Sequence, residues 1–370
     1  ITPSTMQLNR LKWETTTEYN TGLDASFLKG KLRFTVDVYQ KYIKDLLQKK
    51  VKMPTSIGYG NGYEVSYMNS GKMTNKGWEF RVDAVPFENR DWRVGFYFNI
   101  AHNENKITEM PDNYTEENYT FNNGEYAYRR EEGRPMGSFY GYRYKGVCQN
   151  KDATYARDAD GNVMKDISGN AIVMRNGTAT IAPGDALYED INHDGVINQY
   201  DIVYLGNSNP RFTGGAGVNV SYKQFKLSAI FYGRYGQDVV NSTRLNNESM
   251  RGIDNQSTAV LRRWRNEGDQ TDIPRALYGE GYNTLGSDRF VEDASYLRLK
   301  SLSFNYRLPK KIIQRWGFSN IDVYVTGYNL FTWTKYTGQD PEVKTENTYA
   351  RDSATTPASI QLVAGFNLSF

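Results

Sequence analysis

The sequence is poor in the features that identify most soluble enzymes and helical membrane proteins. Its 370 residues include one cysteine and two histidines, so an internal disulfide is excluded and little material is available for histidine-based catalysis. No stretch approaches about 18 consecutive apolar residues, so we expect no membrane-spanning helix, and the mean hydropathy is −0.69. The 45 basic and 42 acidic residues nearly balance without a run of like charges, which gives no reason to expect a nucleic-acid partner.

Aromatic residues, by contrast, are abundant, with 29 Tyr, 17 Phe and 6 Trp making 14% of the chain. Tyr and Trp have one apolar and one polar end, which suits them to membrane interfaces and to sugar-binding surfaces. The low hydropathy does not exclude a membrane, because a transmembrane barrel needs apolar side chains only at alternate positions of each strand.

Several segments alternate apolar and polar residues with the period of two expected for a strand that has one apolar face. Leu32, Phe34, Val36 and Val38 form one apolar row, and another begins at Trp92. The strands that we expect cover residues 14–28, 32–44, 74–86, 92–104, 211–222, 225–236, 294–308, 319–333 and 358–370. Their opposite faces carry several charges, which fits a water-filled lumen better than the dry core of a sandwich.

The connections between the expected strands are of two kinds. Links at residues 28–31, 87–91 and 223–224 are short, whereas polar stretches at about 41–73, 102–210, 237–293 and 334–357 are long. Soluble domains rarely contain structureless connections of that length, but outer-membrane barrels combine short periplasmic turns with long extracellular loops. The strand-like segment Met136–Val147 would put the C-terminus on the extracellular side if it were a wall strand, so we expect it within a loop.

The last expected strand is the most regular. Its apolar residues alternate with small or polar ones and end on the final residue: Ile360, Leu362, Ala364, Phe366, Leu368 and Phe370. Such a strand resembles the recognition signal of outer-membrane barrel assembly, with Phe366, Leu368 and Phe370 as the recognised residues; an edge strand of a soluble sandwich is the alternative. The sequence therefore predicts an all-β protein, the C-terminal part (about nine strands) of an antiparallel transmembrane β-barrel.

The sharpest local motif is the segment Asp190–Asp201, which has the spacing of a twelve-residue calcium loop. Six residues would supply oxygen ligands, all through side chains except Val196, which would use its carbonyl: Asp190, Asn192, Asp194, Val196, Asn198 and Asp201. Gly195 stands where the loop needs a sharp turn, and Asp201 stands where a Glu is usual, which predicts a modest affinity. The alternative is a turn held by its own side-chain-to-backbone hydrogen bonds, and in either case the segment would stiffen a loop.

Other catalytic signals are lacking. We find no nucleophile-elbow motif, metalloprotease helix or phosphate-binding loop, and no acidic pair stands in a glycosidase-like motif. Trp264, within Arg262–Arg265, could stack on a sugar or a peptide, or pack within its own loop. We therefore expect a protein that is not an enzyme.

Six ordered blocks resemble one family. They are Leu11–Leu47, the calcium-type loop with Gly184 and Asp185 ahead of it, Gly206–Phe212, Tyr222–Tyr235, Phe290–Pro309 and Asn329–Val343, followed by the ending GFNLSF. Together they resemble the C-terminal half of SusC/RagA-type TonB-dependent transporters of Bacteroidetes.

The resemblance implies a roughly 22-stranded barrel with long extracellular loops in the cell outer membrane, surrounded by outer-membrane lipid. Residues 1–370 would be its C-terminal part, and residues 105–210 a large extracellular loop that contains the calcium-type loop 190–201. An N-terminal plug domain, the segment that contacts TonB and the remaining barrel strands would lie outside this chain. A SusD-like surface lipoprotein would cap the barrel.

The function that follows is TonB-dependent import of an oligosaccharide, or else an oligopeptide, without covalent chemistry. Calcium would be a structural cofactor, and the residues that touch the glycan or peptide are not identifiable from the sequence. One alternative is a calcium-stiffened outer-membrane barrel that binds or adheres without transport. A secreted β-rich glycanase is the other.

Overall fold

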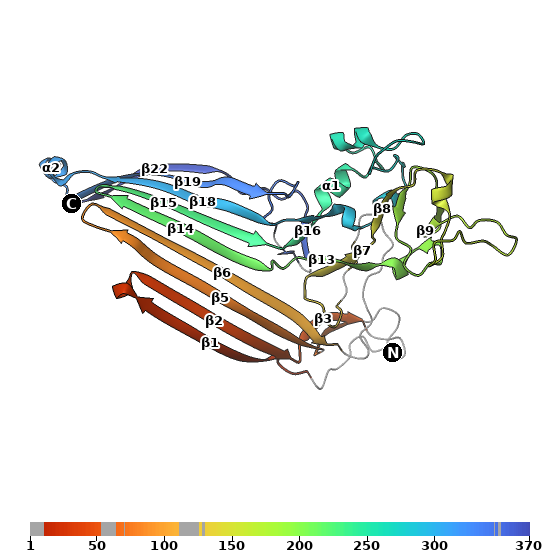
Figure 1. Cartoon of the computed structure of the whole chain (residues 1–370), viewed down its shortest axis with the longest axis horizontal. Helices are drawn as coiled ribbons and strands as arrows, with labels where there is room; N and C mark the ends of the chain where they lie inside the picture. The colour runs from red at the N-terminus through yellow and green to blue at the C-terminus, as the bar shows by residue number, and fades with distance from the viewer. Residues whose placement is uncertain are drawn as a thin grey trace, which may run out of the picture.

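A computed structural model describes residues 11–52, 64–69, 71–110, 126–127, 130–343, 345–346 and 349–370. Its main element is a nine-stranded sheet in which every neighbouring pair of strands is antiparallel and spatial order follows chain order (Figure 1). The strands are β1 (Thr15–Phe27), β2 (Leu32–Lys44), β5 (Lys72–Glu88), β6 (Trp92–Glu109), β14 (Phe212–Tyr222), β15 (Phe225–Tyr235), β18 (Tyr296–Arg307), β19 (Asn320–Thr334) and β22 (Gln361–Ser369).

All nine expected strands are confirmed, and most end within a few residues of the expected positions. The exception is the β5–β6 pair, which continues past residue 104 to Glu109, so the first part of the loop expected at 105–210 is strand. Cross-strand ion pairs explain the extension, since Lys76 lies 3.0 Å from Glu104 and Lys72 also pairs with Glu109. Residues 111–125 and 128–129 of that loop, and residues 1–10, lie outside the described part of the chain.

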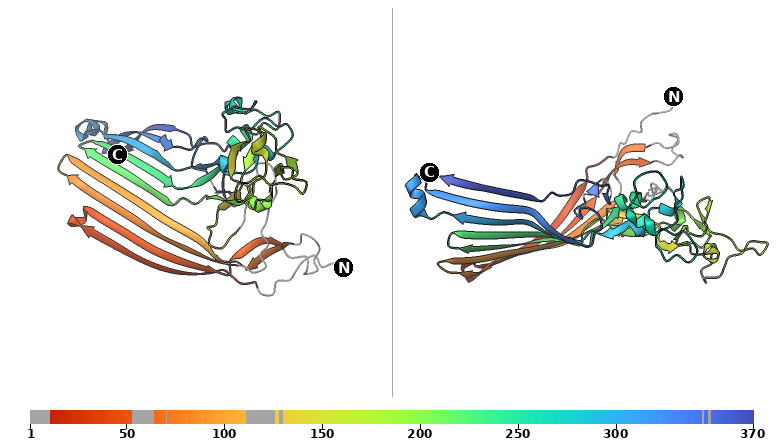
Figure 2. Two further views of the ribbon diagram at one scale, coloured as in Figure 1. Left: turned by 45° about the vertical axis from the view of Figure 1, so that its right-hand side comes forward. Right: turned by 90° about the horizontal axis from the view of Figure 1, so that it is seen from above.

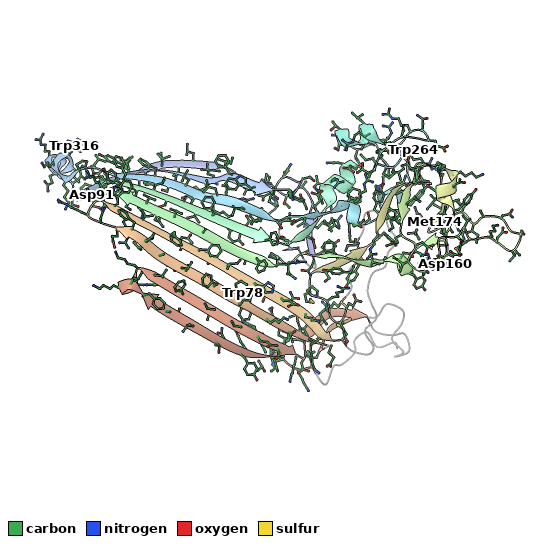
Figure 3. The ribbon with its side chains drawn as sticks, in the orientation of Figure 1. Trp78, Asp91, Asp160, Met174, Trp264 and Trp316 are labelled. Carbon is green, nitrogen blue, oxygen red and sulfur yellow. The ribbon has the colours of Figure 1, made fainter. Side chains whose placement is uncertain are left out.

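Short and long connections lie at opposite ends of the sheet. The short-turn end holds η1 (Leu28–Gly30), the turns at 89–91 and 223–224, and the link α2 (Lys310–Ile313) with η8 (Gln314–Trp316). Figure 3 shows Asp91 and Trp316 at this end and Asp160, Met174 and Trp264 at the other. The C-terminus also lies at the short-turn end (Figure 1), so the expected strand parity is confirmed.

The sheet has one apolar and one polar face, and neither face holds a core. On β6 the side chains of Trp92, Phe96 and Phe98 remain 40%, 41% and 40% exposed. Among the described residues, the four clusters of buried apolar side chains all lie in the long connections. A continuous apolar face that the chain itself leaves uncovered is what a barrel wall presents to lipid.

Tyrosine rings cover glycines on the polar face. A Cβ atom at Gly217 would overlap the ring of Tyr97 on β6, and one at Gly77 would overlap the ring of Tyr39 on β2. Only glycine leaves room for a ring to lie flat against the neighbouring strand, a pairing that fixes strand register in curved sheets. These pairs therefore explain two of the glycines inside wall strands.

The long connections are folded rather than structureless. We call the described parts of the connections after β6, β15 and β19 the lobe: residues 126–127, 130–211, 236–295, 335–343, 345–346 and 349–360 (Figure 2). Its strands are β7 (Ser138–Gly141), β8 (Tyr144–Val147), β9 (Arg175–Asn176), β10 (Ala179–Thr180), β11 (Ala186–Tyr188), β12 (Val196–Ile197), β13 (Val203–Asn207), β16 (Asp238–Asn241), β17 (Val291–Asp293), β20 (Thr345–Glu346) and β21 (Tyr349–Asp352). Its helices are η3 (Lys151–Thr154), η4 (Gln199–Asp201), α1 (Ser242–Asn247), η5 (Thr258–Arg262), η6 (Tyr282–Thr284) and η7 (Asp288–Phe290).

Small sheets join connections that are far apart in sequence. β16 pairs with β17 and with β21, so the connections after β15 and β19 share one four-stranded sheet. β7 and β8 pair with β13 and β11, outside the nine-stranded sheet, as expected for 136–147. A further hairpin, β3 (Leu47–Lys52) with β4 (Glu64–Asn69), was not expected from the sequence. Among the described residues no helix has the length and apolarity to cross a membrane.

Candidate functional site

The segment Asp190–Asp201 forms a closed loop in the lobe. The Asp190 carboxylate accepts a hydrogen bond from the Gly195 N–H at 2.8 Å. The two oxygens of Asp201 accept from the N–H groups of Ile191 and Asn198, each at 2.8 Å. Gly195 has φ +80°, the left-handed conformation that the sharp turn needs. The loop is therefore closed from its first residue to its last by carboxylate-to-backbone hydrogen bonds.

The carboxylates of Asp190 and Asp194 act electrostatically on that of Asp201. Burial raises the pKa of Asp201, and the carboxylates of Asp190 and Asp194 raise it further, against the lowering effect of the N–H groups of Asn198 and Ile191. None of the described ion pairs joins a Lys, Arg or His side chain to the carboxylate of Asp190, Asp194 or Asp201.

The remaining predicted ligands already have partners within the loop. The side-chain amide of Asn192 donates to Asp194 at 2.9 Å, and that of Asn198 donates to the Val196 carbonyl at 3.0 Å. Within the described chain no three Asp, Glu, His or Cys side chains are grouped closely enough to hold a metal. A calcium ion here would depend on amide and carbonyl oxygens as well as carboxylates, and calcium binding stays a prediction.

Two other turns of the lobe use the same closure. Asp158 accepts from the N–H groups of Asp160 and Asn162, and Asp166 accepts from those of Ser168 and Asn170. The N–H group of Asn162 is the main cause that lowers the pKa of Asp158. These turns are closed by hydrogen bonds of their own side chains and backbone, which is the alternative that the sequence left open for 190–201.

A buried ion pair links the 190–201 region to the next long connection. Asp185 is fully buried and accepts from Arg275 Nε at 2.7 Å and from the side-chain amide of Asn283 at 3.2 Å. The Trp264 ring packs directly on Gly184, where a Cβ would overlap it. Trp264 therefore packs against the long connection that precedes β14, beyond the packing within its own loop that the sequence suggested.

On the polar face of the sheet, at the lobe end, a second group of charges fastens the connection that follows β19. Arg298 of β18 is 2% exposed. Its guanidinium pairs with Asp340 and, at 2.8 Å, with Glu342. Lys300 adds a second bond to Glu342 at 3.0 Å. We call this group the Arg298 clamp; it holds residues 340–342 against the inner wall.

Beside the Arg298 clamp lies a pocket of about 790 Å³. Its lining comes from separate parts of the chain and includes Ser208, Asn209, Arg234, Gln237, Asp340, Glu342, Arg351, Thr355 and Thr356. We call it the Arg351 pocket. Sequence reasoning did not identify these residues, because no local motif marks a pocket assembled by the lobe.

A larger hollow of about 1150 Å³ lies on the same face near the short-turn end. Charged side chains from several strands line it, among them Asp24, Arg33, Arg81, Asp83 and Lys226. Arg81 and Asp83 form a two-point ion pair with both bonds at 2.7 Å. A concave face lined by charges on alternate strand residues is the interior expected of a wide barrel.

The C-terminal strand forms as expected. β22 pairs with β19 from Gln361 to Ser369, and Phe366 remains 67% exposed. The Phe370 ring lies 5.0 Å from that of Phe318, and its carbonyl accepts a hydrogen bond from Ser319 Oγ at 3.2 Å. Within the described sheet the other edge of β22 has no partner strand. The role of Phe366, Leu368 and Phe370 in barrel assembly stays a prediction.

Comparison with known proteins agrees with this architecture. The family described as "TonB dependent receptor-like, beta-barrel" matches residues 2–330. TonB-dependent receptor P3 of Formosa agariphila is 32% identical over 92% of this chain, and TonB-dependent receptor SusC of Bacteroides thetaiotaomicron is 27% identical over 97%. The chain spans about a third of the length of these relatives, 32% in both cases.

A solved structure supports the same assignment. A chain of the RagAB peptide transporter superposes with a TM-score of 0.71 at 27% identity, covering 97% of this chain and 36% of that one. These relatives are receptors and transporters rather than enzymes, and TonB-dependent receptors are outer-membrane β-barrel proteins. The chain belongs to the TonB-dependent receptor-like β-barrel family and is the C-terminal portion of a barrel of the SusC and RagA type.

Proposed function

We propose that this chain forms part of the wall and the extracellular lobe of a transporter that imports an oligosaccharide, or an oligopeptide, across the outer membrane. The observation that carries the proposal is the division of the molecule into a two-faced sheet and a folded lobe. The apolar face suits lipid, the charged face suits a water-filled passage, and the lobe stands where a ligand would enter.

The wall needs more strands than this chain supplies. Nine strands do not close a barrel wide enough for an oligomer, and the outer edges of β1 and β22 have no partner strand in the described sheet. Lipid does not tolerate unpaired strand edges. The remaining strands and a plug domain in the lumen would come from the rest of the same gene product.

Energy and a surface partner come from outside the chain. The relatives' dependence on TonB supports an energised import step, and the resemblance to SusC and RagA supports a SusD-like lipoprotein seated on the lobe. The charged hollow near the short-turn end would face the plug.

The ligand class is an oligomer. The name of the RagAB peptide transporter favours a peptide by analogy, whereas the aromatic richness of the chain is equally suited to a glycan.

We also propose that Asp190–Asp201 binds calcium and thereby stiffens the lobe. The support is the donor set: three carboxylates that interact electrostatically and have no basic partner among the described ion pairs, with Asn side chains and a carbonyl in the same loop. A bound cation would offset the mutual repulsion of Asp190, Asp194 and Asp201.

Deletion and complementation test the transport proposal. We expect a strain that lacks the gene to lose uptake of one class of fluorescent oligomer and to regain it with the intact gene. Affinity purification of the intact protein should recover a surface lipoprotein. Unchanged uptake of every glycan and peptide oligomer tested would contradict the proposal.

A further inference from the structure

The Arg351 pocket combines residues from parts of the chain that are remote in sequence. Ser208 and Asn209 precede β14, Arg234 and Gln237 lie at the end of β15, and Arg351 lies on β21. The parallel pairing of Val240 with Arg351 brings β21 to this place. The pocket thus exists only when the lobe is folded against the inner wall.

The acidic residues of the pocket are already neutralised. Asp340 and Glu342 are held by the Arg298 clamp, whose cations Arg298 and Lys300 are not among the residues that line the pocket. Burial alone would raise the pKa of Asp340, but the N–H groups of Ala358 and Glu342 and the Arg298 guanidinium outweigh it, so the pKa is lowered and the group is ionised and satisfied. These two carboxylates therefore do not supply a free negative charge.

The basic residues of the pocket are less fully paired. Arg351 uses Nε to donate to Ser242 Oγ at 2.6 Å, and it has no carboxylate partner among the described ion pairs. Arg234 donates to the Tyr232 hydroxyl at 3.1 Å and is 3.9 Å from Glu342. With Arg298 and Lys300 set against Asp340 and Glu342, Arg234 and Arg351 leave an excess of positive charge.

A buried side chain adds a second, independent observation. Gln237 lines the pocket and is 1% exposed, yet its side-chain oxygen has no hydrogen-bond partner. A buried acceptor without a donor destabilises the folded protein. A ligand that brings an N–H or O–H group next to its anionic group would remove that destabilisation.

The lining also excludes one common mode of recognition. No aromatic ring is present among the described residues that line the pocket, so a neutral sugar would find no face on which to stack. Guanidinium groups bind carboxylates with good geometry and charge-assisted hydrogen bonds.

We propose that the Arg351 pocket binds a carboxylate group of the imported oligomer, with Arg351 as its main cation, Arg234 beside it, and Gln237 as acceptor for a neighbouring N–H or O–H. The inference rests on the proposed import function and narrows its substrate to carboxylate-bearing oligomers. A uronic acid of a glycan and an acidic residue of a peptide supply the same chemistry.

Calorimetric titration of the detergent-purified, full-length transporter tests the proposal. The probes are trigalacturonic acid with its methyl ester, and a glutamate-rich tetrapeptide with its glutamine counterpart. We expect at least one acid to bind more tightly than its neutral partner. The acid that binds shows whether the carboxylate belongs to a glycan or to a peptide.

Substitutions of Arg351 and of a control arginine distinguish the loss of a binding charge from a general loss of folding. Arg351→Gln should weaken the acid about tenfold or more and leave the neutral partner unchanged, and Arg351→Lys should restore part of the loss. The matched control is Arg157→Gln, an exposed arginine that donates to the Gly161 carbonyl in a remote turn of the lobe; it should bind like wild type.

Three outcomes would overturn the proposal: no binding of either acid by the wild-type protein, equal affinity for acid and neutral partner, or an Arg351→Gln variant that binds the acid as wild type does. Failure of the import function has a different signature, since carboxylate-dependent binding to purified protein would persist while cells showed no uptake through it.

Discussion

Among single residues, we expect Arg298 to contribute most to the stability of the lobe end of the wall. Its guanidinium is buried and serves both Asp340 and Glu342. We expect Arg298→Met to destabilise the attachment of residues 335–343 by about 3 kcal/mol, because two partly buried carboxylates lose their main cation. Hydrogen exchange of that segment in the detergent-solubilised protein measures the effect.

Lys300→Met provides the matched control for this prediction. Lys300 pairs with the same Glu342, but its side chain is 34% exposed, so its loss should cost under about 1 kcal/mol. Equal effects of the two substitutions would show that Arg298 is not the residue that holds the segment.

Asp194 tests the calcium proposal. Asp194→Asn keeps an oxygen that can accept from the Val196 N–H but removes one of the three loop charges. Calcium at about a hundred times its dissociation constant should stabilise the wild-type lobe by about 2.7 kcal/mol, and this gain should fall sharply in the variant. Thermal unfolding with calcium or with a chelator measures it.

The control for calcium is Asp158→Asn, in a turn closed by the same type of hydrogen bonds. It should leave the calcium effect intact. A wild-type protein whose unfolding temperature does not respond to calcium would favour the self-closed turn instead.

Among structural elements, β17 joins the connection after β15 to the connection after β19 through Glu292. Its carboxylate accepts from Thr337 N–H and Oγ1 and pairs with Arg244 at 3.0 Å. Burial opposes ionisation of Glu292, but the Thr337 and Arg244 contacts outweigh it and lower its pKa. The contribution of Glu292 to stability is therefore present above the ordinary value of 4.5 and is lost as the pH falls through the lowered pKa.

We accordingly expect Glu292→Gln to destabilise this junction by about 1–2 kcal/mol at neutral pH. The difference from wild type should shrink as the pH falls below 4.5. Hydrogen exchange of β17 and of residues 335–343 across pH measures it, with the exposed Glu267→Gln as control. A pH-independent difference would contradict the assigned role of the charge.

The wall strands could be predicted from the sequence because their pattern is local. Each row, such as Trp92 to Ile100, alternates along one strand, and short turns fix which strands are neighbours. The lobe could not be predicted in this way, since its pairs join distant segments, such as β16 with β21. The residues of the Arg351 pocket are brought together by such pairings, so they could not be identified from the sequence. The 190–201 loop could be identified because its residues form one contiguous segment.

For the whole molecule, an added charge should destabilise the barrel on one face of the sheet and be tolerated on the other. Val218 lies on the apolar face in the middle of β14 and is 41% exposed, while its neighbour Asn219 lines the charged hollow. Val218→Arg should destabilise the barrel by about 2–4 kcal/mol, because an arginine would face the lipid near the bilayer centre. Asn219→Arg should be close to neutral.

Heat-dependent mobility of the folded barrel on detergent gels, after purification from outer membranes, compares these two variants. A destabilised Asn219→Arg with an unaffected Val218→Arg would reverse the assignment of faces.

Energised import is the central claim, and uptake in matched strains with and without TonB tests it most directly. Fluorescent oligomer is supplied to cells that carry the intact gene, and surface-bound and internal label are measured separately. We expect both strains to bind the oligomer at the surface and only the strain with TonB to internalise it. Equal internalisation without TonB, or surface binding without internalisation in both strains, would contradict the account.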